Sequence, residues 1–406
     1  MFRPDAHTLE DRQYVHGASN TIGPSIGVGH AYSLLAHLPG AQEGHWLLPL
    51  NIKRVHSSEN GIDVGVEQFI SATQLKPFQR KLNVMVGDCE YSSIHAISKL
   101  YSYEDKLLLA KARSTRNFYI PAQVSSCTKK GRKPWYGQKF KLNNPATHCE
   151  PDDSLTLGDT TARGKPITIE LKRYNDLLMR GTRAIHMHDK PSDLVQVMAT
   201  RDDGSALFTR PMWLIVSGKQ RKTLTLETIY RTYMSRFDIE HLFRFSKQRL
   251  LFKSFQTPIT GREENWVALV MLAYLQLYAA APLCADRHLR SWERYVMPDD
   301  GLPTPAQTQR AFATLLKQIG TPAYTARPRG NPLGRSKGQT KVARAKAPPI
   351  KKTKPPGKRK QVVNIHGSKE KASSDKPLKL NASQIKILAK VCKLTRAQIS
   401  ALRKAA

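Results

Sequence analysis

Apolar and polar residues alternate along the chain with periods that change from segment to segment, and these changes predict a mixed α/β fold. Ile26–Leu38 and His45–Val55 are predicted to be two strands joined by a glycine-containing turn. Gln68–Leu82 has a helical pattern, and Leu82–Val86 is a short apolar run that is typical of a buried strand.

Asp88 comes directly after this apolar run and Gly87. Open α/β sheets bind their ligands at the carboxyl ends of their strands, so Asp88 is a candidate metal ligand and catalytic residue. The alternative is that Asp88 caps a helix over residues 92–100, because Asp is a favoured N-cap residue.

The segment from residue 107 to about 219 is rich in predicted strands, at Leu107–Ala112, Val195–Ala199 and Trp213–Val216. A polar loop, Thr128–Lys141, combines the aromatic residues Trp135, Tyr136 and Phe140 with six cations: Lys129, Lys130, Arg132, Lys133, Lys139 and Lys141. Cations interleaved with aromatic rings can bind phosphates and stack on bases, so Lys130, Arg132 and Lys133 are candidate DNA contacts. A solvated basic loop is the alternative.

One predicted helix, Leu224–Leu251, carries most of the candidate chemistry. Steps of three, four, four and three residues place five polar side chains in one stripe: Tyr233, Arg236, Glu240, Arg244 and Lys247. Apolar residues elsewhere on the helix can hold it against a core, so that the stripe faces a ligand. One carboxylate among cations suits a divalent metal beside a phosphate backbone. A surface helix with ordinary i,i+4 ion pairs is the simpler interpretation.

Trp266–Ala281 is an almost uninterrupted apolar run that ends before Pro282. Its 16 residues are fewer than the roughly 20 of a membrane-spanning helix, so the run is predicted to be a buried core helix. The N-terminus has no apolar signal segment, and five scattered cysteines argue against a disulfide framework or a zinc site. A cytosolic protein is therefore expected.

Basic residues dominate the composition: 65 Lys and Arg against 32 Asp and Glu give a net charge of +33. Nucleic acid is the expected polyanionic partner, and RNA is the weaker alternative because no RNP-type strand or KH-type GXXG loop is present. No acidic residue lies between Asp300 and Glu370, where Lys and Arg recur amid Pro and Gly, so a disordered basic tail is expected. Asn381–Ala405 regains helical periodicity.

The stripe has the spacing Y-x2-R-x3-E-x6-K and resembles the YREK signature of insertion-sequence transposases. These transposases are DDE enzymes, and the resemblance is in particular to the IS-four and IS-seven-hundred-and-one type. Six other segments resemble the family in order and spacing: Arg3–Ala6, Val28–Ser33, Trp46–Leu50, Val86–Ser92, Gly131–Pro134 and Arg236–His241. Each is a weak motif alone, but their shared order is specific. The resemblance covers roughly residues 1–320.

The resemblance implies an α/β fold with an RNase H-like mixed sheet, a β-rich insertion and a disordered basic tail. Five parts of the chain are then expected. They are the first part of the core at 1–106, the insertion at 107–219, the second part with the signature helix at 220–324, the tail at 325–379 and a C-terminal helical segment at 380–406.

The resemblance also implies Mg²⁺-dependent DNA strand cleavage and transfer at the ends of an insertion sequence, with Mn²⁺ able to substitute. Asp88 and Glu240 are expected to bind metal and catalyse. Arg236 and Lys247 are expected to hold phosphates beside the scissile bond, and Tyr233 to donate a hydrogen bond to the same backbone. Arg244 is included as a DNA contact only because of its place on the stripe.

The expected partners are double-stranded DNA, as transposon ends and as target, and a second copy of the chain in a homodimer on DNA. The expected location is the nucleoid of a bacterial cytoplasm, with no membrane association.

The start of the chain departs from the family pattern. In the family, the first catalytic Asp lies on a strand just before the Arg-Pro-Asp-Ala motif, which is here Arg3–Ala6. That strand and its carboxylate are therefore expected upstream of residue 1, and Asp5 is a weak substitute because no apolar strand precedes it. Two hypotheses follow: an active transposase, or a catalytically inactive, truncated transposase that acts only as a DNA-binding protein or inhibitor.

Overall fold

The computed structural model describes residues 1, 3–16, 26–39, 46–122, 134–161, 164–255, 257–284, 302–320, 334, 336–338 and 345–351. Met1–Lys352 form one compact unit, and Thr353–Ala406 form a second unit that lies outside the described residues. The predicted C-terminal helical segment at 380–406 and most of the predicted tail therefore fall outside the described residues.

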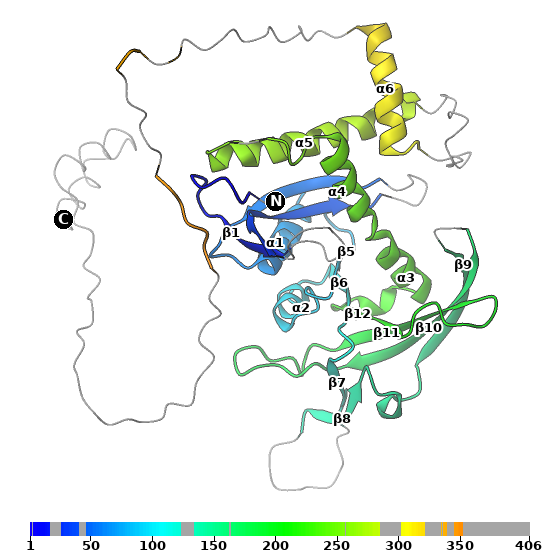
Figure 1. The fold of residues 1–406 in the computed structure, drawn as a ribbon. Helices are drawn as coiled ribbons and strands as arrows, with labels where there is room; N and C mark the ends of the chain where they lie inside the picture. The colour runs from blue at the N-terminus through cyan, green and yellow to red at the C-terminus, as the bar shows by residue number, and fades with distance from the viewer. Residues whose placement is uncertain are drawn as a thin grey trace, which may run out of the picture. The chain divides into compact units, whose positions relative to one another are not determined.

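A six-stranded mixed sheet lies at the centre of the first unit (Figure 1). In spatial order its strands are β5 (Asn83–Gly87), β6 (Lys106–Lys111), β12 (Met212–Ser217), β11 (Ser192–Arg201), β10 (Pro166–Leu177) and β9 (Asp153–Thr160). β5 and β6 run parallel, and every other neighbouring pair is antiparallel. The predicted mixed α/β class is confirmed.

The strands between residues 107 and 219 extend the sheet that β5 and β6 begin, because β12 pairs directly with β6. The strands assigned to a β-rich insertion and those assigned to a core thus share one hydrogen-bonded sheet. β6 is apolar on both faces, with Leu107, Leu108 and Leu109 fully buried. A strand of this kind lies between two covering layers.

Three two-stranded antiparallel sheets accompany the large one: β1 (Gln13–His16) with β2 (Ile26–Gly29), β3 (Ala31–His37) with β4 (Leu48–Val55), and β7 (Asn117–Pro121) with β8 (Tyr136–Lys141). The predicted single strand Ile26–Leu38 is wrong, because it divides at His30 into β2 and β3. The His30 side chain is fully buried and bonds to two other segments, which fixes the backbone there.

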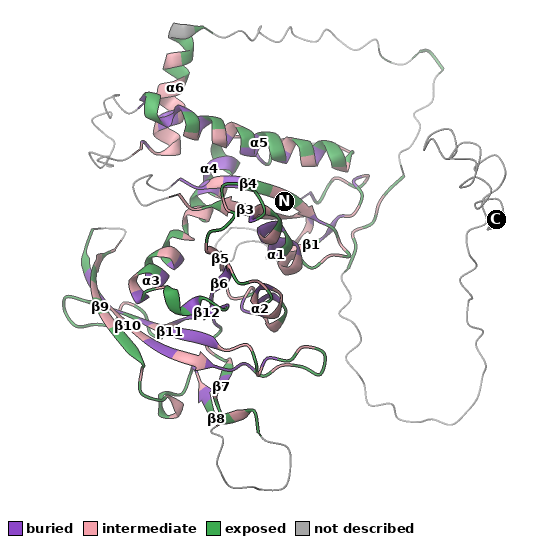
Figure 2. Ribbon diagram, turned by 180° about the vertical axis from the view of Figure 1, so that it is seen from behind, coloured by how far each residue is buried: buried purple, intermediate pink, exposed green. Residues whose placement is uncertain are grey.

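Helices cover both faces of the large sheet. α1 (Gly61–Ala72) and α2 (Ile94–Tyr101) share one apolar cluster with one face, and α3 (Leu226–Ser235) shares a second cluster with the other. Figure 2 shows the buried strands between these layers. Single 3₁₀ turns occur at η2 (Pro145–Thr147) and η3 (Arg221–Thr223).

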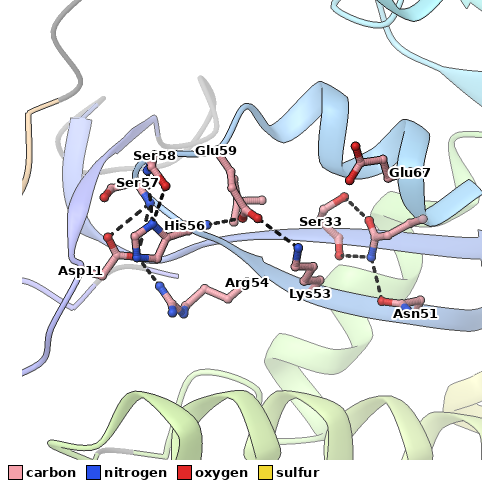
Figure 3. Close-up of polar contacts among 12 residues, drawn as sticks. Asp11, Ser33, Asn51, Lys53, Arg54, His56, Ser57, Ser58, Glu59 and Glu67 are labelled. Atoms are coloured by element: carbon pink, nitrogen blue, oxygen red, sulfur yellow. Dashed lines mark hydrogen bonds and ion pairs between the residues drawn. The ribbon is translucent and has the colours of Figure 1, made fainter. Parts of the chain in front are cut away.

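α1 lies earlier in the chain than the predicted helix Gln68–Leu82, of which residues 73–82 form turns. Gln68 is nevertheless helical, and its amide joins α1 to the β3–β4 hairpin through bonds to Ser33 and Asn51, both labelled in Figure 3. The Ser33 hydroxyl donates to its Oε1 at 2.6 Å, and its Nε2 donates to the Asn51 side chain at 2.8 Å. Both ends of a buried amide are thereby satisfied, as burial requires.

A third layer packs against the β3–β4 hairpin. It consists of α4 (Asp238–Arg249), α5 (Thr260–Ala280), η4 (Ala281–Cys284) and α6 (Pro305–Ile319). Trp46 is the largest side chain of this cluster and lies edge-on to Tyr274 at 5.2 Å and to Tyr278 at 5.5 Å. Its indole N–H donates to the Pro303 carbonyl at 2.9 Å.

α5 is the helix predicted from the apolar run Trp266–Ala281, but it has 21 residues, so the argument from its length against a membrane span was wrong. Among the described residues, one helix has the length and apolar composition to cross a membrane, and it is the one that contains α5. Of its most apolar 18-residue stretch, 44% is buried inside the structure. A core helix of a soluble protein can have the same length and composition, and the inner face of α5 packs on the β3–β4 hairpin as such a helix would. The predicted buried core helix is confirmed for the inner face of α5, whereas its outer face is exposed.

Residues 345–351 lie within the predicted disordered tail yet contact the N-terminal segment. The Ala347 N–H donates to the His7 carbonyl at 2.7 Å, and the Ile350 N–H donates to the Arg12 carbonyl at 2.6 Å. The buried Arg12 guanidinium donates in return to the Ala347 carbonyl at 2.9 Å. The expectation of a tail without structure is therefore wrong for these residues, because the N-terminal segment provides hydrogen-bond partners for them.

Candidate active site and nucleic-acid interface

Asp88 lies at the carboxyl end of β5, where the sequence places it. Its side chain is exposed, and one carboxylate oxygen accepts the Glu90 N–H at 2.9 Å. The cap of α2 is Ser93, whose hydroxyl oxygen accepts the Ala96 N–H at 3.3 Å. The alternative role of Asp88 as a helix cap is therefore wrong.

Tyr91 holds the loop that follows Asp88. Its side chain lies so close to Gly87 that a Cβ there would be 2.8 Å from the Tyr91 Cβ and from two ring atoms, and a Cβ at Gly65 would be 2.3 Å from the Tyr91 hydroxyl. Burial first, and then the charge of Asp88, raise the pKa of Tyr91, while a hydrogen bond with Ser33 opposes the increase. Tyr91 thereby connects the end of β5 to α1 and β3.

The signature segment forms two helices, α3 and α4, so the predicted single helix Leu224–Leu251 is wrong. At the joint the hydrogen bonds run from residue i to i−3: Arg236 N–H to the Tyr233 carbonyl at 3.2 Å, and Glu240 N–H to the Phe237 carbonyl at 3.0 Å. Such bonds tighten a helix from 3.6 to about three residues per turn. The five polar side chains therefore do not form one continuous stripe.

Tyr233 is only 1% exposed and belongs to the core between α3 and the sheet. Its ring meets Phe237 edge-on at 6.2 Å, and the Arg236 guanidinium lies 5.4 Å from the ring centre. Burial raises the pKa of Tyr233, the charge and hydrogen bond of Arg236 oppose this, and the charge of Asp88 adds to the increase. Tyr233 therefore lies near Asp88, but its burial does not fit the expected hydrogen bond to a DNA backbone, because the ring packs into the core.

Arg236, next to Tyr233, has an unused hydrogen-bond donor. Its guanidinium lies over the Phe237 ring at 4.7 Å, and its Nε is buried without a hydrogen-bond partner. A buried donor without an acceptor costs about 1–3 kcal/mol. An anionic oxygen bound at this position would remove that cost.

Glu240 lies in the first turn of α4, with its side chain exposed. Within the described part of the chain, the side chains of Glu240 and Arg244 form no ion pair or hydrogen bond. Lys247, further along α4, lies 5.5 Å from the centre of the Phe243 ring. Partial desolvation of the ammonium group, and then the positive charge of Lys253, lower the pKa of Lys247. This end of α4 thus holds cations that repel each other.

Lys130, Arg132 and Lys133 lie outside the described residues, but the aromatic side chains next to them line a groove. The groove has a volume of about 460 Å³ and is lined by Trp135 and Tyr136 together with Arg180, Arg183 and His186 from a second segment. Trp135 is partly exposed and stacks on His188, with 3.8 Å between ring centres. Sequence reasoning missed the second segment, because only the fold brings residues 180–186 to this loop.

Several motif residues meet at Glu263, which the sequence analysis did not select. Arg3 donates from Nε to this carboxylate at 3.2 Å, a ring nitrogen of His30 lies 2.9 Å from it, and the Tyr32 hydroxyl donates to it at 2.9 Å. Glu263 is 1% exposed, and Arg3 also donates to the carbonyls of Lys253 and Phe255. The motifs at Arg3–Ala6 and Val28–Ser33 therefore hold α5 in place. The one signal in the sequence was an acidic residue at the start of a long uncharged run.

Within the described residues, no group of three or more His, Cys, Asp and Glu side chains is positioned to hold a metal ion. The assigned candidates are the two carboxylates of Asp88 and Glu240. No protein-family model matches the chain, and no curated protein is significantly similar to it.

Proposed function

We propose that the chain is a DDE transposase with the YREK signature and an RNase H-like core, which cleaves and transfers DNA strands at the ends of an insertion sequence. One observation carries this proposal: Asp88, at the carboxyl end of β5, lies close enough to Tyr233 of the signature segment for its charge to raise the pKa of that phenol, and the Arg236 guanidinium lies 5.4 Å from the Tyr233 ring. These residues are far apart in sequence, and the fold brings them to the strand end where α/β sheets bind ligands.

The unused donors support a DNA backbone as the ligand. The buried Nε of Arg236 needs an acceptor, and Arg244 is an exposed cation without a partner among the described residues. Desolvation first, and then repulsion from Lys253, lower the pKa of Lys247, and the negative charge of a bound phosphate would offset both effects. Arg236 precedes α4 and Lys247 lies in its last turn, so the two would contact different phosphates of one strand.

The groove at Trp135 gives a second area of DNA contact. Arg180 and Arg183 are exposed on its wall, and both have the chemistry to bind phosphate. The net charge of +33 agrees with a polyanionic partner. The proposed partners are therefore double-stranded DNA and a second copy of the chain on that DNA, in the cytoplasm.

The donor chemistry of Asp88 and Glu240 fits Mg²⁺, and Mn²⁺ accepts the same oxygen ligands. Mg²⁺ commonly keeps several waters and takes only one or two protein carboxylates together with substrate phosphates. When bound, the metal would activate the attacking oxygen and stabilise the leaving one. The chain itself would orient the DNA through Arg236 at the joint between α3 and α4 and through Arg244 and Lys247 along α4.

The test is Glu240→Gln, with Glu227→Gln as a matched control. Glu227 is also an exposed glutamate near the start of a helix, paired with Arg231 at 2.7 Å, and it lies outside the signature. The substrate is duplex DNA that flanks the coding sequence, with Mg²⁺ or Mn²⁺. We expect Glu240→Gln to lose cleavage by about 100-fold or more while binding persists, because only the metal-binding charge is removed. Normal cleavage by this variant would refute the assignment.

A DNA-binding protein that does not cleave is the second candidate. The observation in its favour is that two acidic side chains, Asp88 and Glu240, are the whole assigned ligand set, whereas fixing a metal pair usually requires more protein ligands. The same assay separates the candidates, because this function predicts that the unaltered chain binds the flanking DNA without any metal-dependent nicking.

A further inference from the structure

The face of α5 that points away from the β3–β4 hairpin carries a second regular stripe. Its exposed members are Asn265, Leu269, Leu272, Gln276, Ala279 and, just beyond α5, Leu283, and we call these six residues the outer stripe. They follow one another at steps of four, three, four, three and four residues, which is the repeat of a coiled-coil seam. Figure 2 shows exposed positions recurring along this helix.

The outer stripe is distinct from the stripe that holds α5 in the fold. The inner positions, including Val267, Val270, Tyr274 and Leu277, are buried in the cluster with the hairpin. By contrast, Leu269, Leu272 and Leu283 are 56%, 55% and 65% exposed. One helix thus has two apolar seams, and the described residues cover only one of them. Three large exposed side chains on one line are a candidate interface.

The charges of the chain restrict what can cover this seam. No Asp, Glu, Lys or Arg occurs from Trp266 to Cys284, so the seam has no cation to offer to DNA. Two copies of a chain with a net charge of +33 repel each other over most of their surfaces. An uncharged apolar seam is where such copies can approach without that cost, and a symmetric dimer uses the same patch on both chains.

We propose that the outer stripe is the contact between two copies of this chain, with the two α5 helices packed antiparallel. In an antiparallel heptad seam the two core positions face each other, so Leu269 would face Ala279 and Leu272 would face Gln276 of the second copy. Each pairing sets a large side chain against a smaller or flexible one. Gln276 is the polar residue in the middle of the seam and selects the register. This inference does not depend on the proposed DNA chemistry.

The seam is short, which sets the strength of the dimer. From Asn265 to Leu283 it is roughly 27 Å long, and a single pair of helices of that length buries less than the roughly 800 Å² per partner of a standard interface. A reversible dimer is therefore expected in solution. Binding of both copies to one DNA molecule would strengthen it through effective concentration.

The test uses sedimentation velocity of the full chain, free of nucleic acid, over a concentration series. Leu272→Glu should raise the dimer dissociation constant by about 30-fold or more, because it places a charge in the centre of the seam. Leu272→Met should leave the constant nearly unchanged. Leu75→Glu is the matched control, because Leu75 is 54% exposed but lies away from α5, and it should also leave the dimer intact. Circular dichroism verifies that each variant is folded.

The antiparallel register has its own test. The double variant Leu272→Glu, Gln276→Lys should dimerise again, because each Glu would then face a Lys of the second copy. In a parallel pair the same change would set like charges together and abolish association. A monomeric wild-type chain, a dimer that survives Leu272→Glu, or a double variant that stays monomeric would overturn the proposal. Binding of a monomeric wild-type chain to neutral lipid vesicles would overturn it in favour of a membrane contact.

Discussion

Two adjacent glutamates on α5 allow a sharp test of the buried network. Glu263 is 1% exposed and interacts with Arg3, His30 and Tyr32, whereas Glu264 is 42% exposed and pairs with Arg54 at 2.5 Å. Figure 3 shows Arg54 on β4, where it also pairs with Asp11. The same substitution, Glu to Gln, can therefore be made at neighbouring positions that differ mainly in burial.

Glu263→Gln keeps one oxygen acceptor but removes the charge that compensates the buried Arg3. Breaking a buried ion pair from one side costs about 3–5 kcal/mol, and the retained oxygen reduces this to about 3 kcal/mol. For a folded unit of the size of Met1–Lys352 the loss corresponds to a decrease in Tm of roughly 4 °C. Glu264→Gln breaks a partly exposed pair and leaves Arg54 its second partner, Asp11, so it should cost less than about 1 kcal/mol. Thermal unfolding followed by circular dichroism measures both.

The difference in Tm between the wild-type chain and Glu263→Gln should also depend on pH. Burial alone would raise the pKa of Glu263, but hydrogen bonds from His30 and Tyr32 and the charges of His30 and Arg3 outweigh it and lower the pKa below 4.5. Stability from such a group is present above its ordinary pKa and is lost as the pH falls through the lowered value. The difference in Tm should therefore be full at neutral pH and shrink below about 4.5. Equal effects of the two substitutions, or a difference independent of pH, would refute the network's role.

Two further predictions concern the tail and the glycines beside Tyr91. Deleting Thr353–Ala406, which holds fourteen Lys and Arg against two acidic residues, should flatten the slope of log K against log salt for DNA binding; an unchanged slope would mean that this segment makes no DNA contact. Gly87→Ala should destabilise the fold by about 2 kcal/mol, because its Cβ would overlap the Cβ and the ring of Tyr91, and in a double-mutant cycle Tyr91→Ala should remove only the part of this effect that is due to the ring. Gly158→Ala, at a position with nothing within 4 Å, is the control, and an equal loss there would contradict the steric explanation.

The elements that sequence reasoning predicted correctly are those whose pattern is local. β5 and β6 are short apolar runs, and Asp88 follows β5 directly, so both the strand and its terminal acid could be recognised. The boundaries that failed depend on distant partners. Ile26–Leu38 divides at His30 because that side chain bonds to Glu263 and Glu10. No local period contains that information.

The sequence selected candidate site residues but not how they lie relative to one another. Spacing selected Glu240 and Lys247 as polar positions of a helix, and both are exposed on α4. Spacing also placed Tyr233 on the polar face of the helix, but the structure buries its phenol ring in the core. The 3₁₀ joint at Arg236 changes the helical phase, so Tyr233 does not share a face with the later polar residues. A uniform period of 3.6 residues cannot represent such a joint.

The contacts of the N-terminal segment have a consequence for biosynthesis. The Arg3 guanidinium donates to a carboxylate 260 residues later in the chain, and the Arg12 guanidinium donates to a carbonyl 335 residues later. On the ribosome the Arg3 guanidinium must therefore wait until residues 253–263 have emerged before it finds its acceptors. Arg12 can donate early to the nearby Arg3 and Pro4 carbonyls, but its hydrogen bonds are complete only once residue 347 has emerged. Closing such long loops is slow, and the waiting segment stays exposed to proteases and to wrong partners. Translation speed between residues 263 and 347 thus becomes a determinant of how much of this protein reaches its folded state.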